Sequence, residues 1–186
     1  MEYPRVSHVL DVLDWGYGNI PPFVLKRAAK YGTGFHNLVH KKTTGQKSRV
    51  TQQYKTRYNV LMEWLNKNQF KVKEAERKIL YIDRIDISKG YQGTCDAILI
   101  NKDHNLILID YKTGRVTKRH FLQCSAYKMA YEQETLTKID KIIIVKPTKE
   151  GIVEEYDLDK PSSYYEKVFL RLLDKYYSNA KHYAKV

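Results

Sequence analysis

The spacing of apolar residues predicts helices at both ends of the chain. From Thr51 onward, apolar residues recur every three or four positions, as on one buried helix face. This helix should end near Asn68, and its stripe is Tyr54, Tyr58, Leu61, Met62 and Leu65. The same spacing predicts a last helix whose core residues are Tyr165, Val168, Phe169, Leu172, Leu173 and Tyr176.

The first part of the chain predicts two shorter helical pieces. Pro21-Pro22 can open a helix through Lys30, because proline is tolerated in a first helical turn. Gly32-Thr33-Gly34 is expected to interrupt it, with a second piece through about Lys42. The polar and basic residues 41–49 contain Gly45 and predict an exposed loop.

Strand-like sequence fills the middle of the chain. Residues 70–87 predict one or two strands, and 91–100 predict another. The apolar run 106–109 is typical of a central strand covered on both faces, and the turn residues before it predict a hairpin. A helix over 118–133, a buried strand over 139–145 and an edge strand over 151–156 should follow. The expected fold class is α/β, with a mixed central β-sheet flanked by helices.

Composition restricts the class of protein. The chain has 186 residues and a net charge of +12, which favours a polyanionic partner, nucleic acid first, although membrane-surface and heparin-binding proteins are also basic. Two cysteines, Cys95 and Cys124, exclude a disulfide framework and a four-thiolate iron–sulfur cluster built from this chain alone. We expect a reducing, cytoplasmic location (the host cytoplasm if the protein is viral). No apolar run predicts a membrane span, and the opening residues lack the apolar core of a signal peptide.

Candidate chemistry lies at the end of the central strand. Asp110 and Lys112 should share one strand face, with Tyr111 on the other, because side chains alternate with period two. Asp96, on the preceding strand, would come near Asp110 in a hairpin. Two close carboxylates repel, and a divalent cation, Mg²⁺ or Mn²⁺ rather than zinc, would relieve this. Such a metal polarises a phosphate, while Lys112 could orient or deprotonate water or stabilise negative charge.

A purely structural interpretation also exists. Asp110 could form a buried ion pair with Lys112 or Arg84, and a lone D-x-K motif often occurs by chance. The apolar strand before the motif, Asp96 on the preceding strand and the basic chain favour a catalytic site.

Several motifs in order resemble a known family. Gly93-Thr94-Cys95-Asp96, Asp110-Tyr111-Lys112 and Gln123-x-x-x-Tyr127 resemble the RecB-like branch of the PD-(D/E)xK nuclease superfamily. Gly32-Thr33-Gly34-Phe35-His36 resembles its amino-terminal G-T-x-x-H motif, and residues 3–10 resemble the opening of phage exonucleases and mitochondrial genome-maintenance exonucleases. The resemblance implies a restriction-endonuclease-like core and a single nuclease domain over 1–186. Its expected parts are a helical part over 1–69, the sheet with the catalytic core over 70–157 and a C-terminal helix over 158–186.

The resemblance also implies metal ligands and a catalytic lysine. Asp96 and Asp110 would bind the metal, His36 would complete its shell from a helix, and Lys112 would be the catalytic lysine. A further glutamate ligand is expected from the strand before Asp96. Glu76 is our choice and Glu74 the runner-up. Parity places both on one strand face, so the sequence does not separate them. Without the motif, His36 would be an ordinary helix histidine and the glutamates solvated strand ends.

Gln123 and Tyr127 share a helix face, and the resemblance places them near the DNA and the active site. They could equally be packing residues, since Leu122, Ala126 and Met129 define a buried stripe beside them. Cys95 is expected to be a small buried residue facing away from Asp96.

Two basic segments could contact phosphates. One contains Lys41, Lys42, Lys47 and Arg49, and the other contains Arg115, Lys118 and Arg119, after Thr113 in the turn beyond Lys112. One of the two is expected to be only a solvated face.

The favoured hypothesis is a metal-dependent DNA exonuclease. It would hydrolyse phosphodiester bonds in single-stranded DNA or DNA with free ends, in phage-type replication or recombination. The alternatives are a structure-selective DNA endonuclease on the same core and a non-catalytic DNA-binding protein. The sequence leaves polarity, protein partners and RNA as a substrate open.

Overall fold

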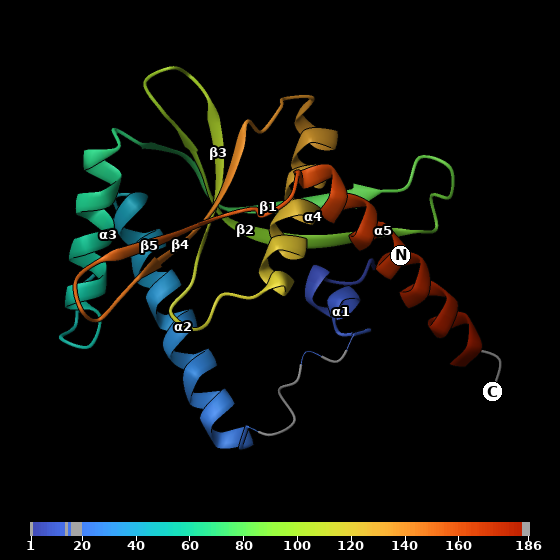
Figure 1. Cartoon of the computed structure of the whole chain (residues 1–186), viewed down its shortest axis with the longest axis horizontal. Helices are drawn as coiled ribbons and strands as arrows, with labels where there is room; N and C mark the ends of the chain where they lie inside the picture. Colours follow the sequence, from blue (N-terminus) through green and yellow to red (C-terminus); the bar gives the residue numbers. More distant parts are fainter. Residues whose placement is uncertain (1, 14, 16–19, 184–186) are drawn as a thin grey trace.

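A five-stranded mixed sheet in the order β1-β2-β3-β4-β5 runs through the middle of the molecule (Figure 1). The computed structural model describes residues 2–13, 15 and 20–183. The strands are β1 (Lys71–Ile82), β2 (Gly90–Ile100), β3 (Leu106–Tyr111), β4 (Lys141–Pro147) and β5 (Val153–Asp157). Among the five described strands, β3 and β4 pair in parallel, and the other neighbouring strands pair antiparallel. The predicted α/β class with a mixed sheet between helices is confirmed.

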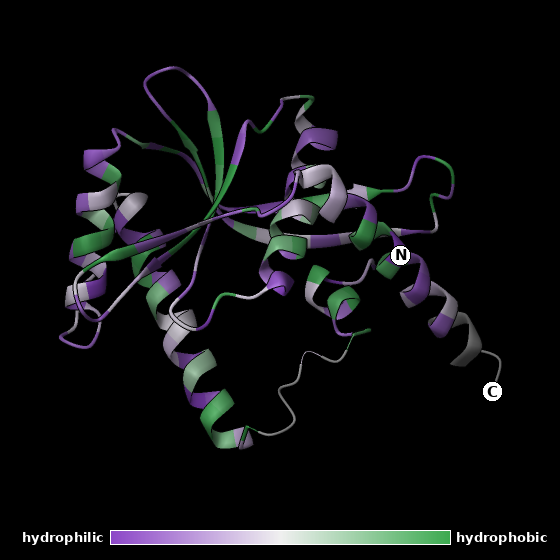
Figure 2. Ribbon diagram, viewed as in Figure 1, coloured by the Kyte–Doolittle hydropathy of each residue, from purple (hydrophilic) through white to green (hydrophobic). Residues whose placement is uncertain are grey.

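Helices cover both faces of this sheet. The helices are α1 (Val6–Leu10), α2 (Pro22–Thr43), α3 (Lys55–Lys67), α4 (Lys118–Thr135) and α5 (Ser162–Tyr183). One apolar cluster joins α2 and α3 to Ile109, and the other joins α1, α4 and α5 to Leu108. Neighbouring residues of β3 therefore face different clusters. Every residue of this strand is buried, and Figure 2 shows most of the strand coloured as hydrophobic. Among the described residues, no helix is long and apolar enough to cross a membrane.

Most of the predicted elements are present. The β2–β3 hairpin forms, α3 ends before Asn68, and β5 is an edge strand. The predicted strand over 139–145 begins two residues later, at Lys141, although Ile139 is buried. The last helix buries Tyr165, Phe169, Leu172 and Leu173 as expected. It is described as far as Tyr183, and residues 184–186 lie outside the described part.

The expected break in the first long helix is wrong. Helix α2 continues through Gly32 and Gly34 and includes Lys41 and Lys42, so the exposed loop begins later than predicted. A glycine inside a helix costs only about 1 kcal/mol, which tertiary contacts can offset. A Cβ built at Gly34 would lie 2.1 Å from Tyr54 Oη, so this glycine lets α2 approach the start of α3 closely.

Two strands part beside the candidate site. Pairing between β2 and β3 ends at Ala97 and Ile109, whereas β2 continues to pair with β1 and β3 with β4. Asp96 and Asp110 are the next residues along the two parting strands. The opening leaves room for polar side chains between two otherwise apolar strands.

Candidate metal centre

Three side chains from three elements converge where the strands part. His36 of α2, Glu76 of β1 and Asp96 of β2 each offer a ligand atom, and these atoms all lie within 4.8 Å of one another. His36 Nδ1 lies 3.0 Å from Asp96 Oδ1. The other oxygen, Asp96 Oδ2, accepts a 2.7 Å hydrogen bond from the Tyr111 backbone N–H. This acidic group could hold a metal ion.

The two carboxylates of the His36–Glu76–Asp96 group place negative charges close together, and a cation would balance them. Burial would raise the pKa of Asp96, but His36, Lys112 and the Tyr111 N–H together outweigh burial and hold it below its ordinary value. Burial raises the pKa of Glu76, and the charge of Asp96 raises it further. Burial would lower the pKa of His36, yet Asp96 raises it above its ordinary value. A divalent cation would stabilise both carboxylates together.

Glu76 reaches the site through an unusual backbone conformation. Its φ of +50° interrupts the strand alternation, and the register of β1 also shifts between Val72 and Glu74. Glu74 accepts a 2.8 Å hydrogen bond from Tyr131 Oη of α4, whereas Glu76 lies beside His36 of α2. The expectation that both glutamates share a face is therefore wrong. Positive φ at a non-glycine residue is strained, and such strain clusters at functional sites.

The buried Asp110 and the half-buried Lys112 form an ion pair beside this group. Lys112 Nζ lies 2.6 Å from Asp110 Oδ2, and the Lys112 backbone N–H donates to Val145 O. Burial raises the pKa of Asp110 to about 6, although Lys112 opposes the rise. Burial would lower the pKa of Lys112, but Asp110 and Asp96 outweigh it and hold it above its ordinary value. The ion pair of the structural interpretation exists, with Lys112 rather than Arg84 as the partner, beside the His36–Glu76–Asp96 group.

The Q-x-x-x-Y and G-x-x-D motifs contact each other. Gln123 Nε2 donates a 2.7 Å hydrogen bond to Tyr127 Oη, and Tyr127 is buried. A Cβ built at Gly93 would lie 2.7 Å from Tyr127 Cε1, so the glycine makes room for this ring. Tyr127 thus packs against the strand that carries Asp96. Cys95 is buried in the cluster on the α4 side, as expected.

The predicted DNA contacts differ in their availability. Arg119 donates to Asp11 Oδ1 at 2.7 Å and lies 5.5 Å from the Trp15 ring centroid, so it anchors the segment that contains α1. Arg115 and Lys118 are exposed near the start of α4. Lys41 is exposed and Lys42 half-buried in the last turn of α2, while Thr113 lines a cavity.

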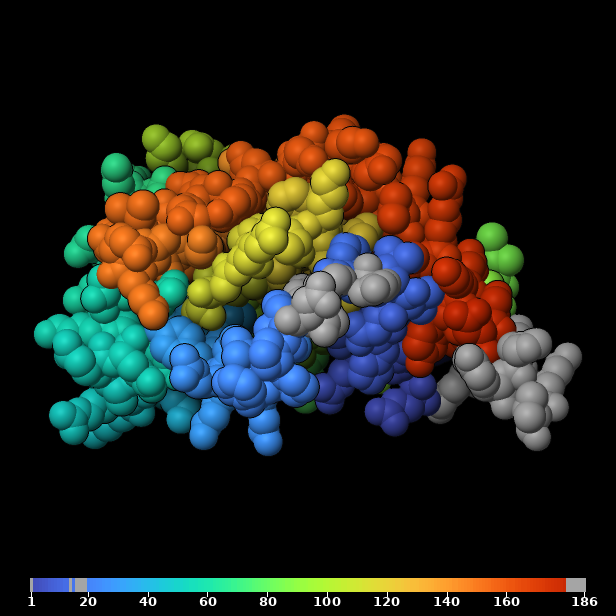
Figure 3. Space-filling view, turned by 60° about the horizontal axis from the view of Figure 1, so that its bottom comes forward, coloured from blue at the N-terminus to red at the C-terminus, as the bar shows by residue number. Residues whose placement is uncertain are grey.

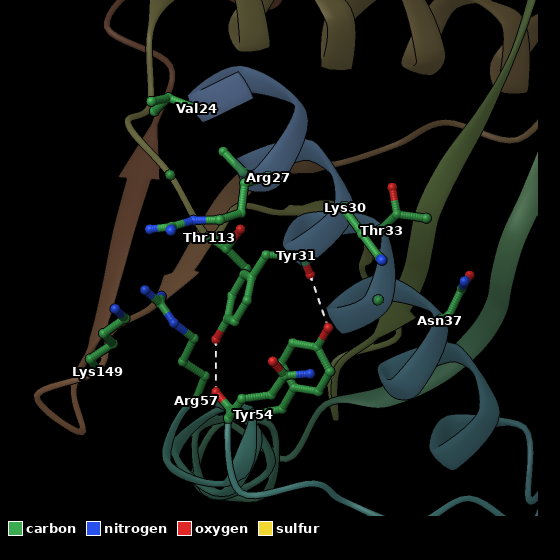
Figure 4. A pocket seen from close by; sticks show the side chains of 14 residues that line it. Val24, Arg27, Lys30, Tyr31, Thr33, Asn37, Tyr54, Arg57, Thr113 and Lys149 are labelled. Atoms are coloured by element: carbon green, nitrogen blue, oxygen red, sulfur yellow. Dashed lines mark hydrogen bonds between the residues drawn. The ribbon is translucent and has the colours of Figure 1, made fainter. Parts of the chain in front are cut away.

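Sequence reasoning missed the cations of that cavity. Arg27 and Lys30 come from α2, Arg57 from α3 and Lys149 from the β4–β5 turn (Figure 4). A signal for Arg57 was present, because this charged residue lies on the apolar stripe between Tyr54 and Leu61.

Comparisons with known proteins relate this chain to solved structures. No protein-family model matches the chain, and no curated protein matches it. A crystal structure from Eubacterium rectale, named a "putative exonuclease", matches with a TM-score of 0.53 at 13% identity, covering 94% of this chain and 82% of its own. The crystal structure of SSO0001 matches at 23% identity with a TM-score of 0.42, covering 66% of this chain; the chain spans 56% of its length. The first likeness shows a shared fold.

Proposed function

We propose that this chain is a metal-dependent deoxyribonuclease of the RecB-like PD-(D/E)xK type. It would hydrolyse phosphodiester bonds from DNA ends and work as one nuclease domain. The observation that carries the proposal is the convergence of His36, Glu76 and Asp96 beside the Asp110–Lys112 ion pair. The net charge of +12 and the fold shared with the Eubacterium rectale protein support it. A role in phage-type replication or recombination rests on the motif resemblance.

The donor set suits a hard divalent cation. His36, Glu76 and Asp96 would hold the ion, with Asp110 close enough for its charge to be felt by Asp96. Carboxylate oxygens suit Mg²⁺ and Mn²⁺, and the imidazole nitrogen favours Mn²⁺ of the two. When bound, such an ion would polarise the scissile phosphate and make a bound water a better nucleophile.

The protein groups divide the remaining work. Lys112 keeps its proton beside Asp110, so we assign it to stabilising negative charge on the reacting phosphate rather than to acting as a base. Asp110 positions Lys112 through their 2.6 Å contact. Gln123 and Tyr127 position β2, because Tyr127 packs against Gly93 three residues before Asp96.

The test is digestion of linear and covalently closed circular single-stranded DNA, with Mg²⁺, Mn²⁺ or EDTA. The wild type should degrade linear DNA only with metal and spare the circles. Lys112→Ala should be inactive, and Lys78→Ala, which removes an exposed lysine from β1, should retain activity.

Two results would change the assignment. Cutting of the circles would make the enzyme an endonuclease with the same centre. Silence on single strands and on duplex ends alike would overturn the enzymatic proposal and favour a DNA-binding role.

A further inference from the structure

A second feature of the structure is a cavity of about 930 Å³, and Figure 4 shows the side chains that line it. Helices α2 and α3, the segment after β3 and the β4–β5 turn form its walls, and α2 and α3 lie side by side on one face in Figure 3. Thr33 and Asn37 of the cavity flank His36 on α2, and Thr113 directly follows Lys112. The cavity therefore adjoins the centre without sharing any of its three ligand residues.

The walls of the cavity are positively charged. Arg27, Lys30, Arg57 and Lys149 line it, and none of its described lining residues carries a carboxylate. None of these four cations takes part in a salt bridge found within the described ranges. Uncompensated like charges around one cavity favour an anionic ligand.

Arg57 is a buried cation in the cavity wall, and its position supports an anion-binding site. Its residue is only 8% exposed, and its Nη1 donates to the Pro147 carbonyl oxygen. Its Nε is buried and has no hydrogen-bond partner in the part of the chain that the structure describes. A buried guanidinium with no carboxylate partner is unfavourable, and an anion in the adjoining cavity would offset its charge.

Two tyrosines hold the wall beside Arg57. The rings of Tyr31 and Tyr54 lie 4.9 Å apart, and Tyr31 Oη donates to the Gln53 carbonyl oxygen at 2.9 Å. The Arg57 guanidinium lies 5.8 Å from the Tyr31 ring centroid. In Figure 4, the nitrogen ends of Arg27, Arg57 and Lys149 lie on the same side of the Tyr31 ring. The wall thus presents three cations to one space.

We propose that Arg27, Arg57 and Lys149 form a phosphate-binding pocket for a nucleic-acid strand whose neighbouring bond reaches the candidate metal centre. Guanidinium groups suit this ligand because they donate several hydrogen bonds in a fixed geometry. The assignment to a strand rests on the proposed function, whereas recognition of phosphate rests on the cavity alone.

The experiment measures binding without catalysis. A fluorescent oligothymidylate is titrated in EDTA with the wild type and with the double variant Arg27→Ala/Lys149→Ala, which removes two exposed cations. Lys67→Ala/Lys102→Ala is the matched control, because it removes the same charge from exposed positions that do not line the cavity. Arg57→Met tests the buried arginine, with its folding checked by a thermal melt.

The pocket variant should bind about tenfold more weakly. Its slope of log K against log salt concentration should become shallower by about 0.7 for each lost phosphate contact. The control should keep the slope of the wild type closely. Equal losses in both double variants would overturn the pocket, since only net charge would then matter.

The source of the phosphate is tested in parallel with inorganic phosphate and pyrophosphate. Cavity-dependent binding of these ions, without oligothymidylate binding, would overturn the assignment to a strand. Oligothymidylate binding that depends on the pocket, in a protein that cleaves no DNA with any metal, would support the pocket and overturn the proposed function.

Discussion

At the scale of single residues, Glu76 and Glu74 provide a matched pair. They are two positions apart on β1, yet one lies in the His36–Glu76–Asp96 group and the other accepts a hydrogen bond from Tyr131. Glu76→Gln should reduce metal-dependent cleavage about 100-fold or more, because outer-shell partners of metals already cost 10–100-fold when removed. Glu74→Gln should stay within a few-fold of the wild type. Initial rates at saturating Mn²⁺ measure both, and the reverse order would exclude Glu76 as a ligand.

His120 predicts how stability depends on pH. Burial lowers its pKa, with Lys112 and Arg119 adding to the effect, to about 4, and its Nδ1 accepts a hydrogen bond from the Thr117 N–H. An unfolded histidine titrates near pH 6.5, so between about pH 6.5 and 4 the unfolded chain binds a proton that the folded chain does not. Stability should therefore be fully present above about pH 6.5 and fall with pH, by about 2 to 3 kcal/mol.

The control for this prediction is His120→Asn, whose side-chain oxygen can accept the same hydrogen bond but does not titrate. Urea unfolding at several pH values should give a shallower loss of stability in the variant. Identical pH profiles would mean that other groups dominate the acid response.

At the scale of elements, the spacing of apolar residues correctly predicted helices and strands whose burial pattern repeats along the sequence. The apolar stripes of α3 and α5 and the run before Asp110 gave the correct helices and central strand because burial repeats along each element. Helix α2 was predicted as two pieces because the penalty at Gly32 and Gly34 is local, while the contact with Tyr54 that favours glycine is not. The face of Glu76 was missed for a similar reason: parity assumes a regular strand, and φ of +50° breaks it.

Two glycines of the motif segments should respond oppositely to alanine. A methyl group at Gly93 would meet the buried Tyr127 ring at 2.7 Å, and overpacking of this kind costs about 1–3 kcal/mol. Among the described residues, a methyl group at Gly32 would meet Thr113 Oγ1 alone, at an ordinary contact distance of 3.5 Å, so Gly32→Ala should gain up to about 1 kcal/mol of helix propensity. Urea midpoints with unchanged m-values measure both. A stable Gly93→Ala would show that Tyr127 can move away from β2.

At the scale of the whole molecule, some parts of the candidate site could be predicted from the sequence and others could not. Asp110 and Lys112 were predicted as site residues because charged residues at the end of an apolar strand stand out along the sequence, and Asp96 was predicted because a hairpin brings the preceding strand beside them. The cavity was missed because Arg27, Arg57 and Lys149 lie on α2, on α3 and in the β4–β5 turn, and only the tertiary structure brings these three segments together. Chemistry held within one hairpin can be predicted from its pattern, whereas a pocket between separate segments requires the tertiary structure.

The placement of the three candidate ligands on separate elements gives a direct test of the metal centre. Because His36, Glu76 and Asp96 belong to α2, β1 and β2, an ion that they bind should stabilise the folded molecule and not the unfolded chain. An ion at 100 times its dissociation constant adds about 2.7 kcal/mol. For a chain of this size, each kcal/mol raises the melting temperature by about 2–4 °C. Mn²⁺ should therefore raise the melting temperature of the wild type by about 5–10 °C, reversibly with EDTA.

Two matched variants test whether the rise in melting temperature with Mn²⁺ comes from the candidate metal centre. Asp96→Asn removes the carboxylate that contacts His36 and should lose most of the shift, while Glu74→Gln should retain it. A structural His36–Asp96 ion pair would give a different result: Asp96→Asn would lower the melting temperature, and Mn²⁺ would move wild type and variant equally. The measurement needs no DNA, so it separates the metal centre from the nuclease activity that we assign to it.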